Sequence, residues 1–332
     1  MPLVIAHRGA SGYRPEHTLA AYELGARQGA DYIEPDLVST ADGHLVARHE
    51  NEISSTTDVA ERPEFADRRT AKTIDGRAHS GFFAEDFTLA ELRTLRARER
   101  IPDLRPANAE HDGRHPIPTF QEIIELAARL SEELGRPVGI YPETKHPSYH
   151  RSIGLPLEPG LVAALRRNGL DRASAPVFVQ SFEVANLQDL ARRIRVPLVQ
   201  LTSASGRPFG HDRTYAEMTT PEGLREIARY ADGLGPDKNQ IVPRDAQNRL
   251  TRRTSLVDDA HRAGLVVHPY TFRPENEFLP EDFRDGDPAS PEYLRARGDQ
   301  SADLAFFYRL GVDGLFADNP DTAVAVRRRV SR

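Results

Sequence analysis

The sequence predicts an α/β protein whose single domain is a (β/α)8 barrel. Eight short apolar runs, each typical of a buried strand, alternate with amphipathic helical patterns along most of the 332 residues. Polar residues follow these runs at their C-terminal ends, where barrel enzymes carry their chemistry. No internal repeat competes with this interpretation. The alternation therefore indicates a parallel barrel.

The predicted elements follow one another in a regular order. The strands are residues 3–6, 31–36, 138–143, 177–180, 198–201, 233–235, 265–269 and 314–317. The first helix opens with Thr18 or His17 as its cap and ends at Gly29. Further helical patterns cover residues 119–134, 159–168, 183–194, 221–231, 254–263 and 300–310, and a short helix follows the last strand.

Turn and cap residues mark several boundaries. Asp42-Gly43 is a hairpin-like turn, so residues 45–49 are predicted to return as a short strand annexed to the second one. Thr119 caps a helix that Gly135 closes. Pro35 removes one ladder donor from the second strand, which is tolerable at a strand end.

Residues 50–118 interrupt the alternation. They are rich in charge, prolines punctuate them, and only 88–98 looks helical. So long an irregular stretch inside a compact domain is usually functional, such as a lid or a substrate wall. We therefore expect one domain over residues 1–332, with an inserted subdomain at approximately 50–118 after the second strand. Shorter insertions are expected at 202–220 and 273–298.

The composition excludes several classes of protein. A formal net charge of -6 gives no broad basic field for nucleic acid. No apolar run approaches the roughly 20 residues of a transmembrane helix. Because the chain has no cysteine, disulfides and thiolate metal sites are excluded, and any metal must bind to oxygen or nitrogen. No leader precedes the first strand, so a cytoplasmic location is expected, with secretion or a periplasmic location after removal of a leader as the alternative.

Three carboxylates lie at the ends of predicted strands. Residues two apart in a strand point to the same side, so Glu34 and Asp36 aim together, and Glu143 ends another strand. Neighbouring carboxylates repel each other unless a cation lies between them or one takes a proton. An all-oxygen set suits a hard cation such as Ca²⁺ or Mg²⁺ rather than zinc. The alternative is that arginines at the barrel rim pair with these carboxylates.

Two histidines, His7 and His49, close strands near this acidic set. Histidine has the pKa for proton transfer near neutral pH, so two of them can serve as base and acid in one displacement. Arg8 and Lys145 add fixed positive charge, which with a cation would attract an anionic ligand such as a phosphodiester. The alternatives are structural histidines and rim ion pairs.

Several motifs are shared with a known family. They are His7-Arg8-Gly9-Ala10-Ser11-Gly12-Tyr13, Pro15-Glu16-His17-Thr18, Glu34-Pro35-Asp36-Leu37, Tyr141-Pro142-Glu143-Thr144-Lys145, His268-Pro269-Tyr270-Thr271 and Gly314-Leu315-Phe316-Ala317-Asp318. In this order and spacing they resemble the glycerophosphodiester phosphodiesterase family over nearly the whole chain. The greatest likeness is to bacterial enzymes with a longer insertion, which include periplasmic and secreted calcium-dependent members.

The resemblance implies a barrel enzyme of glycerol and lipid metabolism. It would hydrolyse small glycerophosphodiesters, such as glycerophosphocholine and glycerophosphoethanolamine, to sn-glycerol 3-phosphate and an alcohol. By motif match, His7 and His49 would be the acid–base pair. One divalent cation, Ca²⁺ rather than Mg²⁺, would bind to Glu34, Asp36 and Glu143. The residues implied to contact the substrate are Arg8, Lys145, Gln180, Phe182 and Tyr270, with Glu16 and Glu50 in supporting roles.

Two positions depart from the family's pattern. The family usually has Asp after the second histidine, where this chain has Glu50. A longer side chain must then orient that imidazole, or another group must do so. Many members have Glu-Asn-Thr where this chain has Glu16-His17-Thr18.

Three other functions would use many of the same residues. A phospholipase-like phosphodiesterase that leaves a cyclic phosphate would need an apolar docking surface, for which only Phe82-Phe83 and Phe87 stand out in the inserted segments. A hydrolase of phosphodiester polymers such as teichoic acid shares every residue of the set. A non-catalytic phosphate-binding barrel would not need both His7 and His49.

Overall fold

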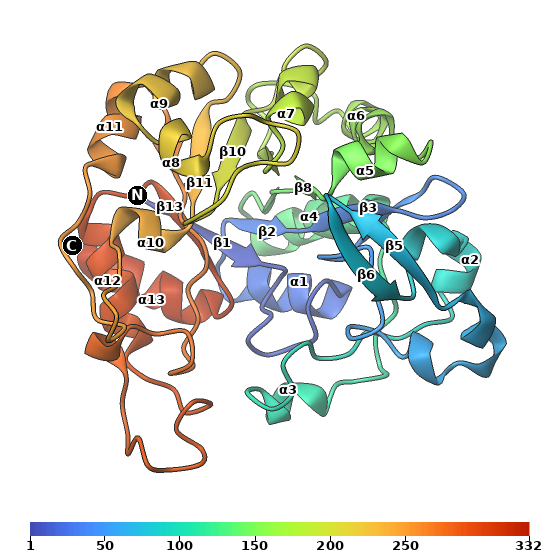
Figure 1. Cartoon of the computed structure of the whole chain (residues 1–332), viewed down its shortest axis with the longest axis horizontal. Coiled ribbons are helices and arrows are strands. Elements are labelled where there is room, and N and C mark those ends of the chain that lie inside the picture. Colours follow the sequence, from blue (N-terminus) through green and yellow to red (C-terminus); the bar gives the residue numbers. More distant parts are fainter. Residues whose placement is uncertain (332) are drawn as a thin grey trace.

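The computed structural model describes residues 1–331, in which the apolar runs form a parallel barrel flanked by helices (Figure 1). The barrel strands are β1 (Leu3–His7), β2 (Tyr32–Glu34), β3 (Asp36–Ser39), β7 (Gly139–Ile140), β8 (Glu143–Thr144), β9 (Val179–Ser181), β10 (Leu198–Thr202), β11 (Gly233–Pro236), β12 (Val266–Val267) and β13 (Gly314–Ala317). They run in the orders β13-β1-β2-β7 and β12-β11-β10-β9-β8-β3-β4, where β4 (Leu45–Ala47) is the strand annexed to β3.

Backbone hydrogen bonds close the barrel between its last two strand regions. The Phe316 N–H donates to Pro269 O at 3.1 Å, and the Phe272 N–H donates to Phe316 O at 2.9 Å. Each predicted strand run therefore joins one ring, and the predicted (β/α)8 barrel is confirmed.

Prolines break the second and third strands of the ring. Pro35 separates β2 from β3, and Pro142 lies between β7 and β8. A proline nitrogen cannot donate to the ladder. Both proline carbonyls still accept, from the N–H groups of Glu143 and Gln180 respectively, each at 2.9 Å. The predicted strands 31–36 and 138–143 are thus each seen as two short strands in line.

Helices cover the outside of the barrel. They are α1 (Leu19–Arg27), α4 (Phe120–Leu134), α6 (Leu157–Arg167), α7 (Val184–Leu190), α9 (Pro221–Ile227), α11 (Leu256–Arg262), α12 (Gln300–Arg309) and α13 (Pro320–Val330). Shorter helices lie in the connections: α5 (Pro147–Ser152), α8 (Tyr215–Met218), α10 (Lys238–Ile241) and η4 (Glu281–Phe283). As predicted, Thr119 caps α4 through a capping box with Glu122, and Gly135 ends it with a left-handed φ of 61°.

Residues 50–118 contain a hairpin and several short helices. These elements are η1 (Val59–Glu61), η2 (Pro63–Arg68), β5 (Thr70–Ile74), β6 (Arg77–Gly81), η3 (Ala84–Asp86), α2 (Leu89–Leu92) and α3 (Pro106–Ala109). Apolar side chains of this segment form a hydrophobic cluster of their own with Val38 of β3 and Val46 of β4 (Leu45–Ala47). We propose that they are a subdomain inserted into one domain over 1–332, of which residue 332 lies outside the described part.

The predicted helix at 88–98 is wrong beyond its first turn. Thr88 and Glu91 form a capping box, but α2 ends at Leu92. The chain then extends, and the Ala97 N–H donates to His115 O at 2.8 Å. This extended course buries Leu95 in the inserted hydrophobic cluster, so tertiary packing outweighs helix propensity.

Other differences are smaller. The hairpin β5–β6 was not expected, although its turn Asp75-Gly76, with both residues at positive φ, is a hairpin signal. The annexed strand predicted at 45–49 ends at Ala47 and pairs antiparallel with β3. Within residues 1–331, no helix combines the length and apolar character needed to cross a membrane.

Candidate active site

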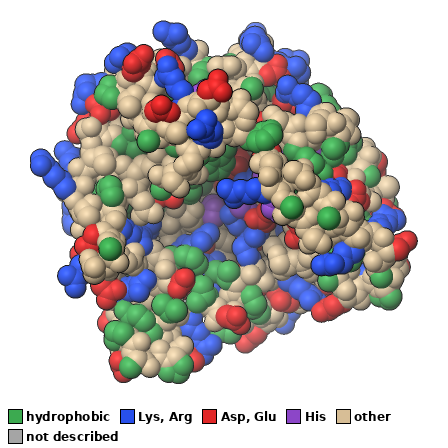
Figure 2. All heavy atoms as spheres, in the orientation of Figure 1, with side chains coloured by type: hydrophobic (Ala, Val, Ile, Leu, Met, Phe, Trp, Pro, Cys, Tyr) green, Lys and Arg blue, Asp and Glu red, His purple; other side chains and the backbone are tan. Residues whose placement is uncertain are grey.

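A cleft of about 430 Å³ opens at the C-terminal ends of the barrel strands. Figure 2 shows a hollow in the viewed face, with histidine and Lys or Arg side chains at its floor. His7 ends β1 and Glu34 ends β2, while Asp36 begins β3 and Glu143 begins β8. All four side chains line the cleft together with His49. The site therefore lies at the end of the barrel where the sequence predicts it.

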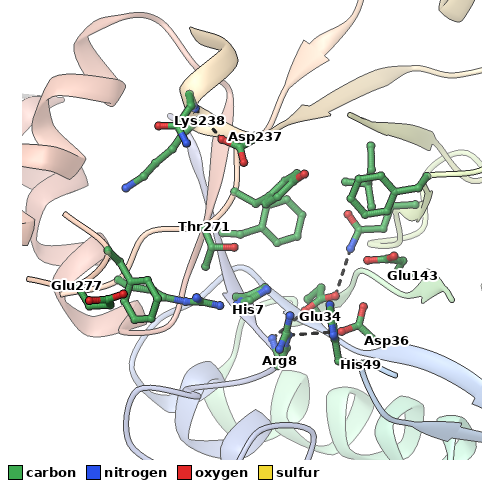
Figure 3. Close-up of a pocket in the computed structure, with 18 of the residues that line it drawn as sticks. His7, Arg8, Glu34, Asp36, His49, Glu143, Asp237, Lys238, Thr271 and Glu277 are labelled. Atoms are coloured by element: carbon green, nitrogen blue, oxygen red, sulfur yellow. Dashed lines mark hydrogen bonds and ion pairs between the residues drawn. The ribbon is translucent and has the colours of Figure 1, made fainter. Parts of the chain in front are cut away.

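Glu34, Asp36 and Glu143 form a buried group, with donor oxygens within 4.8 Å of one another. Strand register brings them together, because His7 is opposite Glu34 in the β1–β2 pair and Asp36 is opposite Glu143 in the β3–β8 pair. Figure 3 shows the three carboxylates beside Arg8 and His49. Since Ca²⁺–oxygen distances are about 2.3–2.6 Å, one such ion fits between them.

Hydrogen bonds hold the acidic group in place. Glu34 Oε2 accepts from the Arg8 backbone N–H at 2.7 Å, and Glu34 Oε1 accepts from Gln180 Nε2 at 3.2 Å. His17 Nε2 lies 2.8 Å from Asp36 Oδ2. Asp36 Oδ1 and Gln180 Oε1 are buried without a hydrogen-bond partner among residues 1–331. These two free oxygens are available to a cation or a ligand hydroxyl.

A tight turn aims the backbone at Glu34. Arg8 has a φ of 57°, and Gly9 follows at 86°. A Cβ on Gly9 would lie 2.5 Å from the Ala21 backbone carbon, so α1 packs directly against this turn. Only glycine fits there, and the turn that it permits points the Arg8 N–H at the carboxylate.

Burial and mutual repulsion perturb the acidic group. Burial, with the charges of Asp36 and Glu143, raises the pKa of Glu34 well above its usual value. Burial also raises the pKa of Glu143 to about 8, despite the neighbouring Lys145. Burial alone would raise the pKa of Asp36, but the charge of Lys145 helps to hold it well below its usual value. A divalent cation would relieve this repulsion, so the residues present fit one.

His7 is oriented by a carboxylate from the last strand of the barrel. Its Nδ1 lies 2.7 Å from Asp318 Oδ1, which follows β13. This contact assigns the proton to Nδ1 and leaves Nε2 as an acceptor. Burial and the charge of Arg8 lower the pKa of His7 to about 4. His7 is therefore neutral near pH 7 and able to take a proton.

His49 has a similar arrangement. Its Nδ1 is bonded to Glu50 Oε1, so the glutamate that replaces the family's usual Asp reaches the imidazole directly. Burial and the charges of Arg8 and Lys145 lower the pKa of His49 to about 3. Both histidines are thus neutral imidazoles with a carboxylate on Nδ1, and both line the same cleft.

The two predicted phosphate-binding cations are buried at the acidic group. Arg8 Nη1 donates to Glu16 Oε2 at 2.8 Å, and its Nε is 3.5 Å from Asp36 Oδ2. Lys145 Nζ lies 2.8 Å from Glu143 Oε1. Glu16 thus contacts Arg8, consistent with the supporting position predicted for it.

The remaining predicted residues lie in the cleft wall. Gln180, Phe182 and Tyr270 all line it. The rings of Phe182 and Tyr270 meet edge to face, with centroids 6.1 Å apart. Tyr270 Oη donates to Thr202 O at 3.0 Å, which fixes the ring.

Sequence reasoning missed several residues at this site. It gave no role to Asp318, although a polar residue at a strand end was a usable signal. It assigned His17 to the helix entry, whereas the ring also contacts Asp36. Arg100, Arg105 and Arg273 each bond a carboxylate near the histidines, and they come from irregular segments that offered no periodic signal.

Known proteins resemble the chain over nearly its full length. The model of the Glycerophosphoryl diester phosphodiesterase family matches residues 7–322. Glycerophosphodiester phosphodiesterase GDPD6 of Arabidopsis thaliana is 37% identical over 96% of this chain and 83% of its own. The glycerophosphodiester phosphodiesterase of Haemophilus influenzae is 32% identical over 97% of this chain and 88% of its own.

Solved structures share the fold. A putative glycerophosphoryl diester phosphodiesterase from Silicibacter pomeroyi has a TM-score of 0.70 at 22% identity, covering 100% of this chain and 94% of its own. An Oleispira antarctica phosphodiesterase, solved in complex with the product sn-glycerol-3-phosphate, has a TM-score of 0.60 at 20% identity, over 99% of this chain and 97% of its own. The family model and the relatives above confirm the resemblance to the family, and the solved structures share its fold. The chain belongs to the glycerophosphoryl diester phosphodiesterase family.

Proposed function

We propose that this protein hydrolyses small glycerophosphodiesters, such as glycerophosphocholine and glycerophosphoethanolamine, to sn-glycerol 3-phosphate and an alcohol. The observation that carries the proposal is the buried acidic group beside two histidines, His7 and His49, in one cleft. Family membership supports the reaction class. The product in the Oleispira antarctica structure, whose fold this chain shares, agrees with it.

The charges of the site suit a monoanionic phosphodiester. Three carboxylates contribute three negative charges, and a divalent cation with Arg8 and Lys145 contributes four positive ones. Arg8 also pairs with Glu16, so with a cation bound the site would be close to neutral and could accept a ligand with a single negative charge.

Glu34, Asp36 and Glu143 would hold the cation. When bound, a divalent cation supplies charge stabilisation to a phosphate oxygen and orients a neighbouring hydroxyl. We propose Ca²⁺ rather than Mg²⁺, because Ca²⁺ accepts irregular sets of carboxylate oxygens, whereas Mg²⁺ demands nearly ideal octahedral geometry. The unpartnered oxygen of Asp36 supports the set as an ion-binding one.

His7 and His49 would move the protons. One imidazole takes the proton of the nucleophile, which is water or the neighbouring glycerol hydroxyl, as the nucleophile's oxygen bonds to phosphorus. The other must first take up a proton from solvent at Nε2. It then donates that proton to the oxygen of the departing alcohol as the old phosphorus–oxygen bond breaks. The carboxylates on Nδ1, from Asp318 and Glu50, keep each Nε2 available.

Further residues, in the cleft or next to its carboxylates and Arg8, would bind and orient the substrate. Arg8 and Lys145 would contact phosphate oxygens, and Glu16 would hold the Arg8 guanidinium in position. Gln180, Phe182 and Tyr270 would contact the organic part of the substrate, because they form one wall of the cleft.

An action on intact lipid is less well supported. The phenylalanines of the insertion that could have formed an apolar docking surface are buried, with Phe82 5% and Phe83 and Phe87 0% exposed. They stabilise the inserted segment instead of meeting a membrane. A phosphodiester polymer would use the same groups as a small substrate.

The test is release of glycerol 3-phosphate from glycerophosphocholine. The purified protein is assayed alone, with a chelator, and with Ca²⁺ or Mg²⁺ added back. Phosphatidylinositol vesicles and a glycerol phosphate polymer are assayed in parallel. Chelator-sensitive release from the small substrate is expected, and no turnover of it under any metal condition would contradict the proposal. Binding of glycerophosphocholine in calorimetry without product would identify a binding protein.

A further inference from the structure

We propose that Arg100 and Arg105, two arginines of the inserted segment, position the two histidines of the cleft. Each arginine holds the carboxylate that its histidine contacts: Arg105 acts through Asp318 on His7, and Arg100 acts through Glu50 on His49. The inference rests on the proposed acid–base roles of the histidines and adds the source of their orientation.

We call each set of arginine, carboxylate and histidine a relay. The first relay runs from Arg105 of the insertion through Asp318 to His7. Arg105 Nη2 donates to Asp318 Oδ2 at 2.7 Å, while the other oxygen of Asp318 lies 2.7 Å from His7 Nδ1. Arg105 is itself fixed, because its Nε donates to Glu275 Oε1 at 2.7 Å and its Nη1 donates to Ser11 O at 2.9 Å. Its side chain is 7% exposed and that of Asp318 is 2% exposed.

The second relay runs from the same stretch of chain to His49. Arg100 Nη2 donates to Glu50 Oε2 at 2.7 Å, and Arg100 Nη1 donates to Glu50 Oε1 at 3.1 Å. Glu50 Oε1 also bonds His49 Nδ1. Arg100 further holds Glu16 through its Nε at 2.9 Å. A bidentate guanidinium fixes the plane of the carboxylate, and hence the plane of the imidazole bonded to it.

The surroundings leave these side chains little freedom. His7, the two arginines, Asp318 and Glu16 line a cavity of about 30 Å³, which is about the volume of one water. The Arg105–Asp318 pair is largely removed from solvent, so deletion of Arg105 leaves a buried charge with fewer partners. Arg100 and Glu50 are 24% and 34% exposed, so deletion of Arg100 instead releases the carboxylate from its two-point contact. A changed arginine should therefore displace its carboxylate and with it the histidine.

The two carboxylates differ in how many guanidinium groups they bond. Arg273 Nε also donates to Asp318 Oδ2, at 3.0 Å. Loss of Arg105 would thus leave Asp318 with one guanidinium. The His7 relay should therefore be less sensitive than the His49 relay, in which Arg100 is the guanidinium bonded to Glu50.

The insertion offers a matched control. Arg98 forms a two-point ion pair with Glu61 at the surface, with one contact of 2.8 Å between Nη1 and Oε1. It lies two residues before Arg100 and does not line the cleft. Arg98→Gln removes the same functional group from the same segment without touching either relay.

The experiment compares Arg98→Gln, Arg100→Gln and Arg105→Gln on glycerophosphocholine. We expect kcat to fall about 10-fold to 100-fold in Arg100→Gln and less in Arg105→Gln, because a misplaced group slows the chemical step. KM should change much less than kcat. A small KM effect is expected in Arg100→Gln, because Arg100 also holds Glu16, which bonds Arg8, and none is expected in Arg105→Gln. Arg98→Gln should behave as wild type. A KM effect without a kcat effect would assign Arg100 to substrate binding through Glu16 and Arg8, and would overturn the inference.

A second substrate makes the test specific for each relay. Glycerophospho-p-nitrophenol has a leaving group that needs no general acid. The alanine variant of the histidine that acts as the acid should be faster on this substrate than on glycerophosphocholine. The glutamine variant of the arginine in the same relay should gain rate in the same way. The other histidine and its arginine should stay slow. Recovery of both arginine variants, or of the arginine from the opposite relay, would overturn the inference.

Folding and function are separated by two further measurements. Circular dichroism melting of each variant shows whether the insertion remains folded. If a glutamine variant does not fold, Arg100→Lys and Arg105→Lys keep the charge but lose the two-point contact, and they enter the same comparison. Near wild-type rates in both histidine variants would contradict the proposed function itself. If the histidine variants have low rates and the arginine variants have wild-type rates, only this inference is contradicted.

Discussion

His7 Nδ1 lies 2.7 Å from Asp318 Oδ1, although 311 residues separate them in the chain. The barrel brings them together, because β1 pairs with β13, His7 ends β1 and Asp318 directly follows β13. The first and last barrel strands thereby complete one half of the proposed acid–base pair.

Asp318→Asn tests this contact. The amide can place its oxygen or its nitrogen toward His7, but its missing charge no longer stabilises the imidazolium, so kcat should fall by about 10² to 10⁴. Initial rates on glycerophosphocholine measure the change. Asp321→Asn, at a surface carboxylate that bonds Tyr13, is the control. A loss smaller than threefold would mean that Asp318 does not support His7.

Replacement of either histidine should stop efficient turnover. His7→Ala and His49→Ala remove a proton-transfer group, which is worth roughly 10²-fold or more in kcat. The fold should survive, because both side chains face the cleft rather than the main hydrophobic core. Rates and circular dichroism of both variants check this. Wild-type rates in both would end the acid–base assignment.

Binding of a cation should stabilise the protein. The acidic group repels itself when empty, so Ca²⁺ should raise Tm by a few degrees, in accord with mass action on the folded state. Differential scanning fluorimetry against Ca²⁺ and Mg²⁺ concentration measures the effect. Glu143→Gln should abolish most of the Ca²⁺ response, whereas Glu64→Gln, at an exposed carboxylate, should not. An unchanged Tm with and without Ca²⁺ would contradict the site.

His17 should tune the affinity for the cation. Its ring bonds Asp36 on one side and the Tyr22 hydroxyl on the other. Partners of this kind are worth about 10-fold to 100-fold in metal affinity, so His17→Leu should raise the Ca²⁺ concentration for half-maximal activity by that factor. His146→Leu, at a histidine bonded to Asp75 of the insertion, should leave that concentration unchanged. Equal Ca²⁺ requirements in wild type and His17→Leu would exclude the role.

Stability should fall on mild acidification. Burial lowers the pKa of His150 to about 3, and both ring nitrogens lack hydrogen-bond partners in the described part of the chain. The unfolded chain takes up a proton near pH 6.5, so the stability that His150 contributes is complete above that pH and is lost as the pH falls toward 3. The loss from this residue should be about 2 kcal/mol at pH 5.

Urea unfolding at pH 7.5 and pH 5 measures that loss. His150→Phe should reduce the difference between the two pH values by about 2 kcal/mol. His44→Phe, at an exposed histidine, is the control. An undiminished pH dependence in His150→Phe would contradict the assignment.

The parts of the site that lie on strands could be predicted from the sequence. Glu34 and Asp36 are two apart at a strand end, and this spacing alone put both carboxylates on one side. The barrel itself followed from the alternation of short apolar runs with helical patterns. These are local signals, and the structure preserves them.

The contributions of irregular segments could not be predicted in this way. Arg100 and Arg105 reach Glu50 and Asp318 through contacts that span 50 and 213 residues. No periodicity encodes such distances. The backbone of His17 has a φ of 55°, and from this conformation its ring reaches Asp36. The pattern of helix-capping residues does not predict where that ring points. The length and composition of residues 50–118 mark them as unusual, but they do not indicate which of their arginines reach the site.

The prolines within the second and third strands bear on how readily the acidic group accepts an ion. Pro35 and Pro142 stand directly before Asp36 and Glu143, and a pyrrolidine ring has one fixed backbone angle even in the unfolded chain. Less conformational entropy is therefore lost there when the chain folds, and the folded strands hold both carboxylates before an ion arrives. The site is thus preorganised, and it should discriminate between ions by their radius rather than adapt to each of them.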